Sequence, residues 1–472
     1  MRLGHALQIG ATPDYLAANG HYLQAIALAD AFGVQRTKAE AYMGLALLHG
    51  FSGEPTAAQQ AAREGLAIIE PSGDLWMDAL LRLVFGAVCV VSGLPEAEPW
   101  LQTVLDSCRM SKDSYVQAVA HFWLAAWHHR AGHMEAADRH ALQTLNLAQQ
   151  YGYDRLLTRP TLLGPRDRMT LVPVLLAGRD APNLGAFAET LLTQGFPAIA
   201  SDAMTETYHP GMTLRVQLFD RLRVWRGTEE VAPRAWHRKK AQQLLALLLT
   251  NRHQWLLRDQ ICEALWPDDS QADVETQFKV MLNALNGALE PGRPPRIPPF
   301  FIRRQGSAYR FCPPDGIWLD VAEFEALLES AKTRLATGTD DDAAAAQQAL
   351  TRAVRLYQGD YLSEYLYEDW AREERERMVT RYLEAATTLA ELHSRQNQAA
   401  ETIWLCEMIL ARDSCWEEAY QLLMRAYADQ SNRSQIVATY DRCVRNLRAN
   451  LDMAPLPRTT EIFEAVKARF AR

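Results

Sequence analysis

The sequence lacks the motifs that most readily identify phosphate-binding enzymes and metal-binding domains. None of its 25 glycines is followed by lysine, so no G-x-x-x-x-G-K-[ST] loop is present to hold a nucleoside triphosphate. Its seven cysteines form no C-x-x-C pair, which argues against zinc ribbons and thioredoxin-type redox sites. A G-x-S-x-G nucleophile motif is also absent. We therefore expect a protein that is not an enzyme and that uses neither a cofactor nor a metal.

Long apolar runs are missing as well. Uninterrupted apolar runs stay far below the roughly 18 residues that a membrane-spanning helix needs. The N-terminus has no apolar core of a signal peptide, and the cysteine spacing implies no disulfide framework. The sequence therefore predicts a cytoplasmic protein with reduced thiols and without a membrane partner.

Several histidines lie close together in the sequence, namely His128, His129, His133 and His140. A turn separates the first two from the last two, and no cysteine or carboxylate joins them at the spacing of zinc ligands. We expect ordinary helix positions for these histidines and no metal site.

The sequence also lacks an overall positive charge. The formal net charge is -8, which gives the whole protein no electrostatic attraction for nucleic acid. The charge is uneven, however. Residues 211–318 carry 16 basic and 11 acidic side chains, a charge of +5, whereas residues 1–210 (14 against 20) and 319–472 (19 against 26) are acidic. A basic central segment therefore lies between two acidic ones.

Glycines recur at a nearly constant distance in the N-terminal part. Gly53, Gly93 and Gly132 are 40 and 39 residues apart, and each follows a small residue by seven positions. Such a unit is typical of helical hairpins, because small residues let two helices approach and glycine accepts the turn conformation. The long, proline-free stretches 39–49, 80–91 and 116–129 predict the helices themselves.

A second helical repeat lies near the C-terminus. At a spacing of 34 residues, Leu389, His393, Ala400, Cys406 and Ile409 correspond to Leu423, Tyr427, Ser434, Tyr440 and Cys443. This period is the length of a tetratricopeptide hairpin. Upstream of the repeat, the acidic run 340–342 favours a helix N-terminus, where negative side chains match the helix dipole.

Between the two helical parts the periodicity changes. Alternating apolar residues at 214–218, with short runs at 222–225 and 230–231, predict strands. Helical patterns follow at 235–250, 258–265 and 272–289, and the last two are closed by Pro267 and Pro291. The runs 300–304 and 308–311 flank Gly306 and predict a hairpin. This order of elements resembles an OmpR-type winged helix.

The third helix of this segment has an apolar stripe opposite a polar face. The stripe consists of Val274, Phe278, Met281, Leu282, Leu285 and Leu289, and the polar face carries Thr276, Lys279, Asn283 and Asn286. A major groove admits one helix, and Asn and Lys suit adenine and guanine edges respectively. The polar face is therefore a candidate for base recognition, and an ordinary solvent-exposed face is the alternative.

Basic residues surround this helix. The first helix opens with Arg238, Lys239 and Lys240, where cations oppose the helix dipole unless a phosphate lies there. The hairpin carries Arg303, Arg304 and Arg310, where a wing meets backbone phosphates. We interpret both groups as phosphate contacts. The alternative is that these basic residues only maintain solubility, which explains a single cluster more easily than several clusters around one helix.

These motifs resemble the SARP family, the Streptomyces antibiotic regulatory proteins. The resemblance is carried by Leu214–Gly227, Arg234–Asn251, Leu265–Pro267, Phe278–Pro291 and Trp318–Val321 with Phe324. The chain is also similar to the bacterial transcriptional activator domain of that family at Gly359–Leu362, Trp370, Leu422–Tyr427, Tyr440–Leu451 and Pro455. The N-terminal repeats resemble the tetratricopeptide-like repeats of MalT-type bacterial regulators.

The resemblance implies a transcriptional activator that binds direct-repeat promoter sites on double-stranded DNA and recruits RNA polymerase. A homodimer on DNA, and a protein or small-molecule signal at the N-terminal repeats, are further partners that it suggests. Two alternatives stay open. One is an adaptor whose helical repeats assemble partners and whose winged helix mediates protein contacts. The other is a remnant or subunit of an NTPase switch, which the missing phosphate loop disfavours.

The expected fold is mainly α and multidomain, with tetratricopeptide-like repeats flanking a small α+β winged helix-turn-helix domain. The expected domains are a repeat array at 1–178, a helix and linker at 179–212, the winged helix at 213–318 and the activator domain at 319–472.

Overall fold

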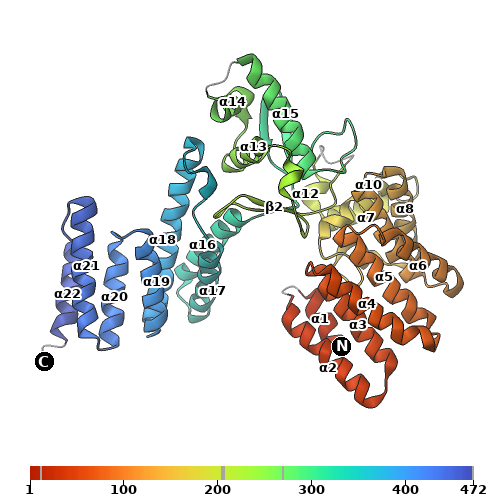
Figure 1. Ribbon diagram of the computed structural model, residues 1–472, viewed down its shortest axis with the longest axis horizontal. Coiled ribbons are helices and arrows are strands. Elements are labelled where there is room, and N and C mark those ends of the chain that lie inside the picture. Colours follow the sequence, from red (N-terminus) through yellow and green to blue (C-terminus); the bar gives the residue numbers. More distant parts are fainter. Residues whose placement is uncertain (11–12, 203–207, 268–270, 470–472) are drawn as a thin grey trace. The chain divides into compact units, whose positions relative to one another are not determined.

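The structure is a computed structural model that describes residues 1–10, 13–202, 208–267 and 271–469. The chain forms two units. One comprises Met1–Arg215 and Arg223–Ile317, and the other comprises Val216–Leu222 and Trp318–Arg472. Helices dominate both units (Figure 1). The prediction of a mainly α, multidomain fold is therefore confirmed.

The first unit begins with a series of helices that pack against their neighbours in the sequence (Figure 1). We call residues 1–200 the helical array. Its helices are α1 (Arg2–Ile9), α2 (Tyr15–Phe32), α3 (Gln35–Phe51), α4 (Pro55–Ile69), α5 (Leu75–Ser92), α6 (Ala97–Ser111), α7 (Ser114–Arg130), α8 (Met134–Tyr151), α9 (Asp154–Thr158), α10 (Val172–Arg179), α11 (Gly185–Gly195) and α12 (Pro197–Ala200).

Glycines form the turns of the array where the sequence predicts them. Gly53, Gly93 and Gly132 have φ values of 80°, 67° and 78°, in the left-handed region that glycine adopts without strain. They follow α3, α5 and α7 respectively. The predicted close approach of helices occurs at Gly86, where an added Cβ would lie 2.7 Å from the side chain of Leu101.

Helix α5 is the most apolar helix of the array. By length and composition it is the one described helix that could cross a membrane. Its sequence includes Asp78 and Arg82, which is why uninterrupted apolar runs in the sequence are shorter. In the structure it is a core helix, because residues such as Leu81, Val84 and Val88 are buried. Packing between neighbouring helices accounts for its composition.

The rest of the first unit contains a compact group of three helices and short strands. Strands β2 (Arg223–Arg226) and β3 (Glu229–Glu230) are antiparallel, with Trp225 opposite Glu230. The helices are α13 (Lys239–Thr250), α14 (Arg258–Leu265) and α15 (Gln271–Leu289). A three-stranded sheet of order β4-β6-β5 consists of β4 (Leu256–Leu257), β6 (Ala308–Phe311) and β5 (Ile302–Gln305). Strands β1 (Leu214–Gln217) and β7 (Ile317–Leu319) lie where the chain passes between the units.

The predicted helices and strands of this segment are present within one or two residues, except at the start of α13, and strands β4 and β7 were not predicted. A helix from residue 235 was expected, but residues Pro233–Trp236 form a 3-10 turn and His237 has a φ of 55°. Helix α13 therefore begins only at Lys239, with Arg238 as its N-cap residue. The apolar stripe of α15 is buried as predicted, with Phe278, Leu285 and Leu289 at most 1% exposed, except at Leu282, which is half-buried.

Within the first unit, polar contacts hold the segment before β1 and strand β3 against the array. Asp167 accepts hydrogen bonds from the backbone N–H of Thr213 at 2.6 Å and from its hydroxyl at 2.8 Å. The Nε2 atom of His129 lies 2.9 Å from the carbonyl oxygen of His209. Arg130 forms an ion pair with Glu229.

The second unit is a further series of helices. They are α16 (Asp320–Thr337), α17 (Asp340–Leu356), α18 (Arg372–Arg395), α19 (Ala399–Arg412), α20 (Glu417–Asp429), α21 (Arg433–Leu451) and α22 (Pro457–Ala468). Helices α18 to α21 correspond to the two halves of the predicted 34-residue repeat. The acidic run 340–342 forms the first turn of α17, as predicted, and Thr339 caps that helix.

Asp320 anchors the segment Val216–Leu222 in the second unit. Its carboxylate accepts hydrogen bonds from the backbone N–H groups of Leu218 and Phe219, at 2.8 Å each, and from that of Val321. The Phe219 ring packs edge-to-face on Phe324 with 5.4 Å between ring centroids. Burial raises the pKa of Asp320 to about 6, against the effect of the three hydrogen bonds.

Candidate nucleic-acid interface

Helix α15 presents an exposed polar ridge on the side opposite its buried stripe. The ridge consists of Glu275, Thr276, Lys279, Val280 and Asn283, all of which are exposed. Glu275, Lys279 and Asn283 recur every four residues, and Thr276 and Val280 directly follow the first two, so the five positions lie on one side of the helix. Three of the predicted base-reading residues, Thr276, Lys279 and Asn283, therefore lie together on this ridge.

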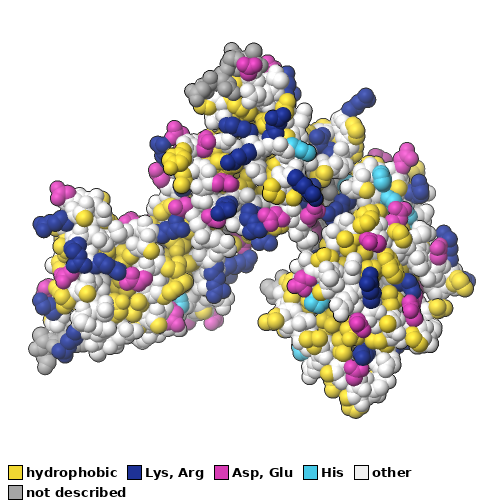
Figure 2. All heavy atoms as spheres, viewed as in Figure 1, with side chains coloured by type: hydrophobic (Ala, Val, Ile, Leu, Met, Phe, Trp, Pro, Cys, Tyr) yellow, Lys and Arg dark blue, Asp and Glu magenta, His cyan; other side chains and the backbone are white. Residues whose placement is uncertain are grey.

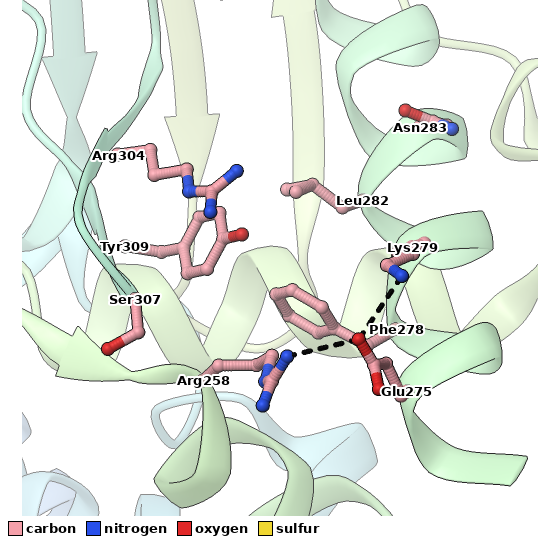
Figure 3. A pocket seen from close by; sticks show the side chains of 9 residues that line it. All are labelled: Arg258, Glu275, Phe278, Lys279, Leu282, Asn283, Arg304, Ser307 and Tyr309. Carbon is pink, nitrogen blue, oxygen red and sulfur yellow. Dashed lines mark hydrogen bonds and ion pairs between the residues drawn. The ribbon is translucent and has the colours of Figure 1, made fainter. Parts of the chain in front are cut away.

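A concave site lies between α15 and the β5–β6 hairpin (Figure 3). It encloses about 430 Å³. Phe278, Leu282 and Tyr309 supply apolar lining, and Phe278 packs edge-to-face on Tyr309 with 5.1 Å between ring centroids. The remaining lining residues are Arg258, Glu275, Lys279, Asn283, Arg304 and Ser307. The site thus has an aromatic base and a charged rim.

An ion-pair chain crosses this rim. The Glu275 carboxylate lies 3.1 Å from the Lys279 Nζ atom and 3.3 Å from an Nη atom of Arg258 (Figure 3). The hydrogen bond from Lys279, together with the charges of Lys279 and Arg258, lowers the pKa of Glu275. Glu275 is therefore an ionised acceptor at neutral pH, held between two cations.

The hairpin places its three predicted arginines in different surroundings. Arg304 is exposed at the rim of the concave site, and its guanidinium lies 5.8 Å from the Tyr309 ring centroid. Arg310 is half-buried, donates to the carbonyl oxygen of Arg252 at 3.2 Å and stacks over Trp255.

Arg303 is buried, unlike the other two. Its guanidinium forms two hydrogen bonds of 2.7 Å with the carboxylate of Asp202, and the two side chains are 9% and 18% exposed. Because neighbouring residues in a strand point to opposite faces, Arg303 faces the array side while Arg304 faces the solvent. The structure therefore assigns Arg303 to an internal ion pair, in place of the exposed position expected for a phosphate contact.

Asn286 also lies away from the ridge. It is 5% exposed, and its Oδ1 atom is buried without a hydrogen-bond partner in the described part of the chain. Asn286 lies in the last two turns of α15, where Leu285, Ala288 and Leu289 are also buried, so the helix is covered over a wider arc there than at Asn283. The prediction that Asn286 shares an exposed face with Asn283 is therefore wrong.

The basic residues at the start of α13 also differ in exposure. Arg238 and Lys239 are exposed, and no side chain caps the first turn. Lys240 is half-buried and donates to the carbonyl oxygen of Leu265 at 2.5 Å, beside the Trp266 ring. Its ammonium group therefore satisfies the C-terminus of α14.

The structure also adds residues that the sequence reading did not single out. Glu275, Val280, Arg258 and Ser307 lie on the ridge or line the concave site. The spacing of four residues between Glu275 and Lys279 was the available signal for their ion pair. The contact of Arg258 with Glu275 depends on how α14 packs against α15, which no local pattern gives.

Comparison with known proteins connects the second unit to one family. Residues 319–467 match the family model described as "Bacterial transcriptional activator domain". The predicted resemblance of this part of the chain is therefore confirmed. No curated protein matches the sequence.

One solved structure that aligns with this chain is "Mycobacterium tuberculosis EmbR in complex with low affinity phosphopeptide". The alignment has 20% sequence identity and a TM-score of 0.48. It covers 55% of this chain and 66% of the EmbR chain, just under two thirds of the latter.

Proposed function

We propose that this protein is a DNA-binding transcriptional regulator of the SARP type. The match of residues 319–467 to a bacterial transcriptional activator domain supports a role in transcription. The basic composition of residues 211–318, between two acidic segments, supports DNA as the partner of the central part. In this proposal residues 213–318 act as a winged helix-turn-helix domain.

The exposed ridge of α15 is the observation that carries the proposal. Thr276, Lys279 and Asn283 project from one face of a helix whose opposite face is buried. A helix seated in this way inserts its free face into a major groove, where Asn suits adenine and Lys suits guanine. We assign base recognition to these three side chains.

Four basic residues supply the proposed phosphate contacts. Arg238 and Lys239 lie at the uncapped start of α13, and Arg304 and Arg310 lie on the hairpin. A phosphate at a helix N-terminus gains from the free N–H groups and the dipole. Figure 2 shows Lys and Arg side chains in dark blue over the region of α13 to α15.

The remaining parts of the chain receive roles by resemblance. The activator domain contacts RNA polymerase and supports a dimer on direct-repeat sites, and the helical array, acting as a tetratricopeptide-like domain, receives a protein or small-molecule signal. The protein works in the cytoplasm, as an activator and not as an enzyme. Resemblance to the family supports these assignments.

A set of alanine variants of the full chain tests whether different residues carry base recognition and phosphate binding. In mobility-shift titrations, Lys279→Ala with Asn283→Ala should reduce preference for the selected site, because base contacts carry specificity. Arg304→Ala should weaken binding to all sequences alike, because phosphate contacts are independent of sequence. Identical effects of the two changes would contradict the assigned roles.

A protein-binding adaptor is the second candidate function. Arg303 and Lys240 are engaged in internal contacts, and Glu275 adds a negative charge to the ridge. These three observations reduce the positive charge available for DNA. Absence of DNA binding at low salt, together with capture of a protein on the same ridge, would favour this alternative.

A further inference from the structure

Glu275 is an unexpected residue on a ridge that approaches DNA. A free carboxylate there would repel the phosphates, yet this one is flanked by two cations. It lies 3.1 Å from Lys279 on its own helix and 3.3 Å from Arg258 on α14. Its charge is therefore neutralised locally, and its position on the ridge is fixed from two sides.

The chemistry of the major groove limits what a carboxylate can read. An ionised carboxylate only accepts hydrogen bonds, so it is incompatible with guanine O6 and N7 and with thymine O4. The groove offers donors only at cytosine N4 and adenine N6, and adenine N6 lies beside the acceptor N7. Cytosine is therefore the base that Glu275 fits.

Lys279 is complementary to Glu275 in its hydrogen bonding. Its ammonium group only donates hydrogen bonds, and guanine presents two acceptors to the major groove. In a C·G pair, cytosine N4 and guanine O6 are hydrogen-bonded to each other, so they lie about 3 Å apart. The Glu275 and Lys279 charges are separated by the same distance.

We propose that Glu275 and Lys279 act together as a reader of one C·G base pair. Glu275 accepts from the cytosine N4 amino group, and Lys279 donates to guanine O6 or N7. Arg258 holds the carboxylate in place and so acts as a positioning residue. This inference rests on the proposed function, since it requires α15 to enter a major groove.

Three further exposed residues share the ridge with Glu275 and Lys279. Thr276 and Asn283 lie on the same exposed face, one residue after Glu275 and four after Lys279. Val280 is 42% exposed between them, and its methyl groups suit contact with a thymine methyl group. The pair therefore reads one position within a longer site.

Site selection from a randomised duplex library tests the proposal with the full-length protein. The wild type should enrich a motif that contains an invariant C·G pair. Glu275→Gln should lose that preference by roughly tenfold and shift it toward adenine, because Gln pairs with adenine N6 and N7. Lys279→Gln should relax the same base pair, and the other positions of the motif should stay unchanged.

Glu263→Gln provides a matched control. Glu263 is an exposed carboxylate on α14 that lies outside the concave site, so this variant undergoes the same chemical change. It should select the wild-type motif. Circular dichroism of each variant checks that the fold is retained.

The outcomes separate this inference from the function on which it rests. Wild-type protein that shows no salt-sensitive DNA binding contradicts the proposed function itself. Wild-type binding with a motif that Glu275→Gln reproduces unchanged overturns only the base-pair reader. Salt-sensitive binding that enriches no motif overturns the base-pair reader and also the base recognition assigned to the ridge. Effects of the Glu275 and Lys279 variants on two different base pairs also overturn it.

Discussion

The ion pair between Arg303 and Asp202 should contribute to stability and not to DNA binding. Its two hydrogen bonds are 2.7 Å long, and only 9% of the Arg303 side chain is exposed. Replacing Asp202 with Ala leaves a buried guanidinium without its carboxylate. Breaking a buried pair in this way costs about 3 to 5 kcal/mol, and we expect a value near the lower end because Asp202 is 18% exposed.

A double-mutant cycle measures the coupling directly. Urea unfolding, followed by tryptophan fluorescence, should show a loss of about 3 kcal/mol for Asp202→Ala. The pair of changes Asp202→Leu with Arg303→Met should recover most of this loss, because apolar residues of similar volume often replace a buried ion pair without cost. The single variants Asp202→Leu and Arg303→Met complete the cycle, and additive effects of these two changes would refute the coupling.

Measurements of DNA binding test the claim that Arg303 does not contact DNA. Arg303→Met should leave the salt dependence of DNA binding unchanged, because the buried side chain contacts no phosphate in our account. Arg304→Met, its exposed neighbour and matched control, should reduce the slope of log K against log salt by about 1. A larger change for Arg303→Met than for Arg304→Met would show that Arg303 leaves its pocket to bind DNA.

Two further predictions concern packing and pH. Asp320→Asn should destabilise the second unit by about 1 to 3 kcal/mol, because an amide nitrogen would face the backbone N–H donors of Leu218 and Phe219. The folded-state pKa of Asp320 is about 6, above the unfolded value near 4, so the folded protein binds more protons between these values. Stability from this group should therefore fall as the pH rises from about 4 to 6, and calorimetry of the Asn variant should lack this pH dependence. In the array, Gly44→Ala should lower the unfolding temperature, since the new Cβ would lie 2.3 Å from the Tyr22 ring; an unchanged temperature would contradict this close packing.

Local patterns were sufficient to predict most of the elements. The apolar stripe of α15, the glycine turns of the array and the hairpin around Gly306 depend on neighbours within one or two helical turns. Such short-range patterns also predicted the exposed positions of Thr276, Lys279 and Asn283.

Long-range partners could not be predicted in this way. Arg303 pairs with Asp202, which is 101 residues away in the sequence, and Lys240 donates to a carbonyl 25 residues away. No periodicity links such positions, so the sequence predicted that Arg303 and Lys240 are exposed and available to phosphates. Asn286 is a different case. Its spacing of three residues from Asn283 fits the polar face, and it is buried because the C-terminal end of α15 is covered on more sides, with Ala288 and Leu289 buried as well.

The salt dependence of DNA binding by the full-length protein tests the central claim most directly. With Arg238, Lys239, Arg304 and Arg310 at phosphates, log K should fall linearly with log salt, with a slope of about -3 to -4. Fluorescence anisotropy with a labelled duplex measures this slope. Binding that is absent at low salt, or that does not change with salt, would contradict a DNA-binding role.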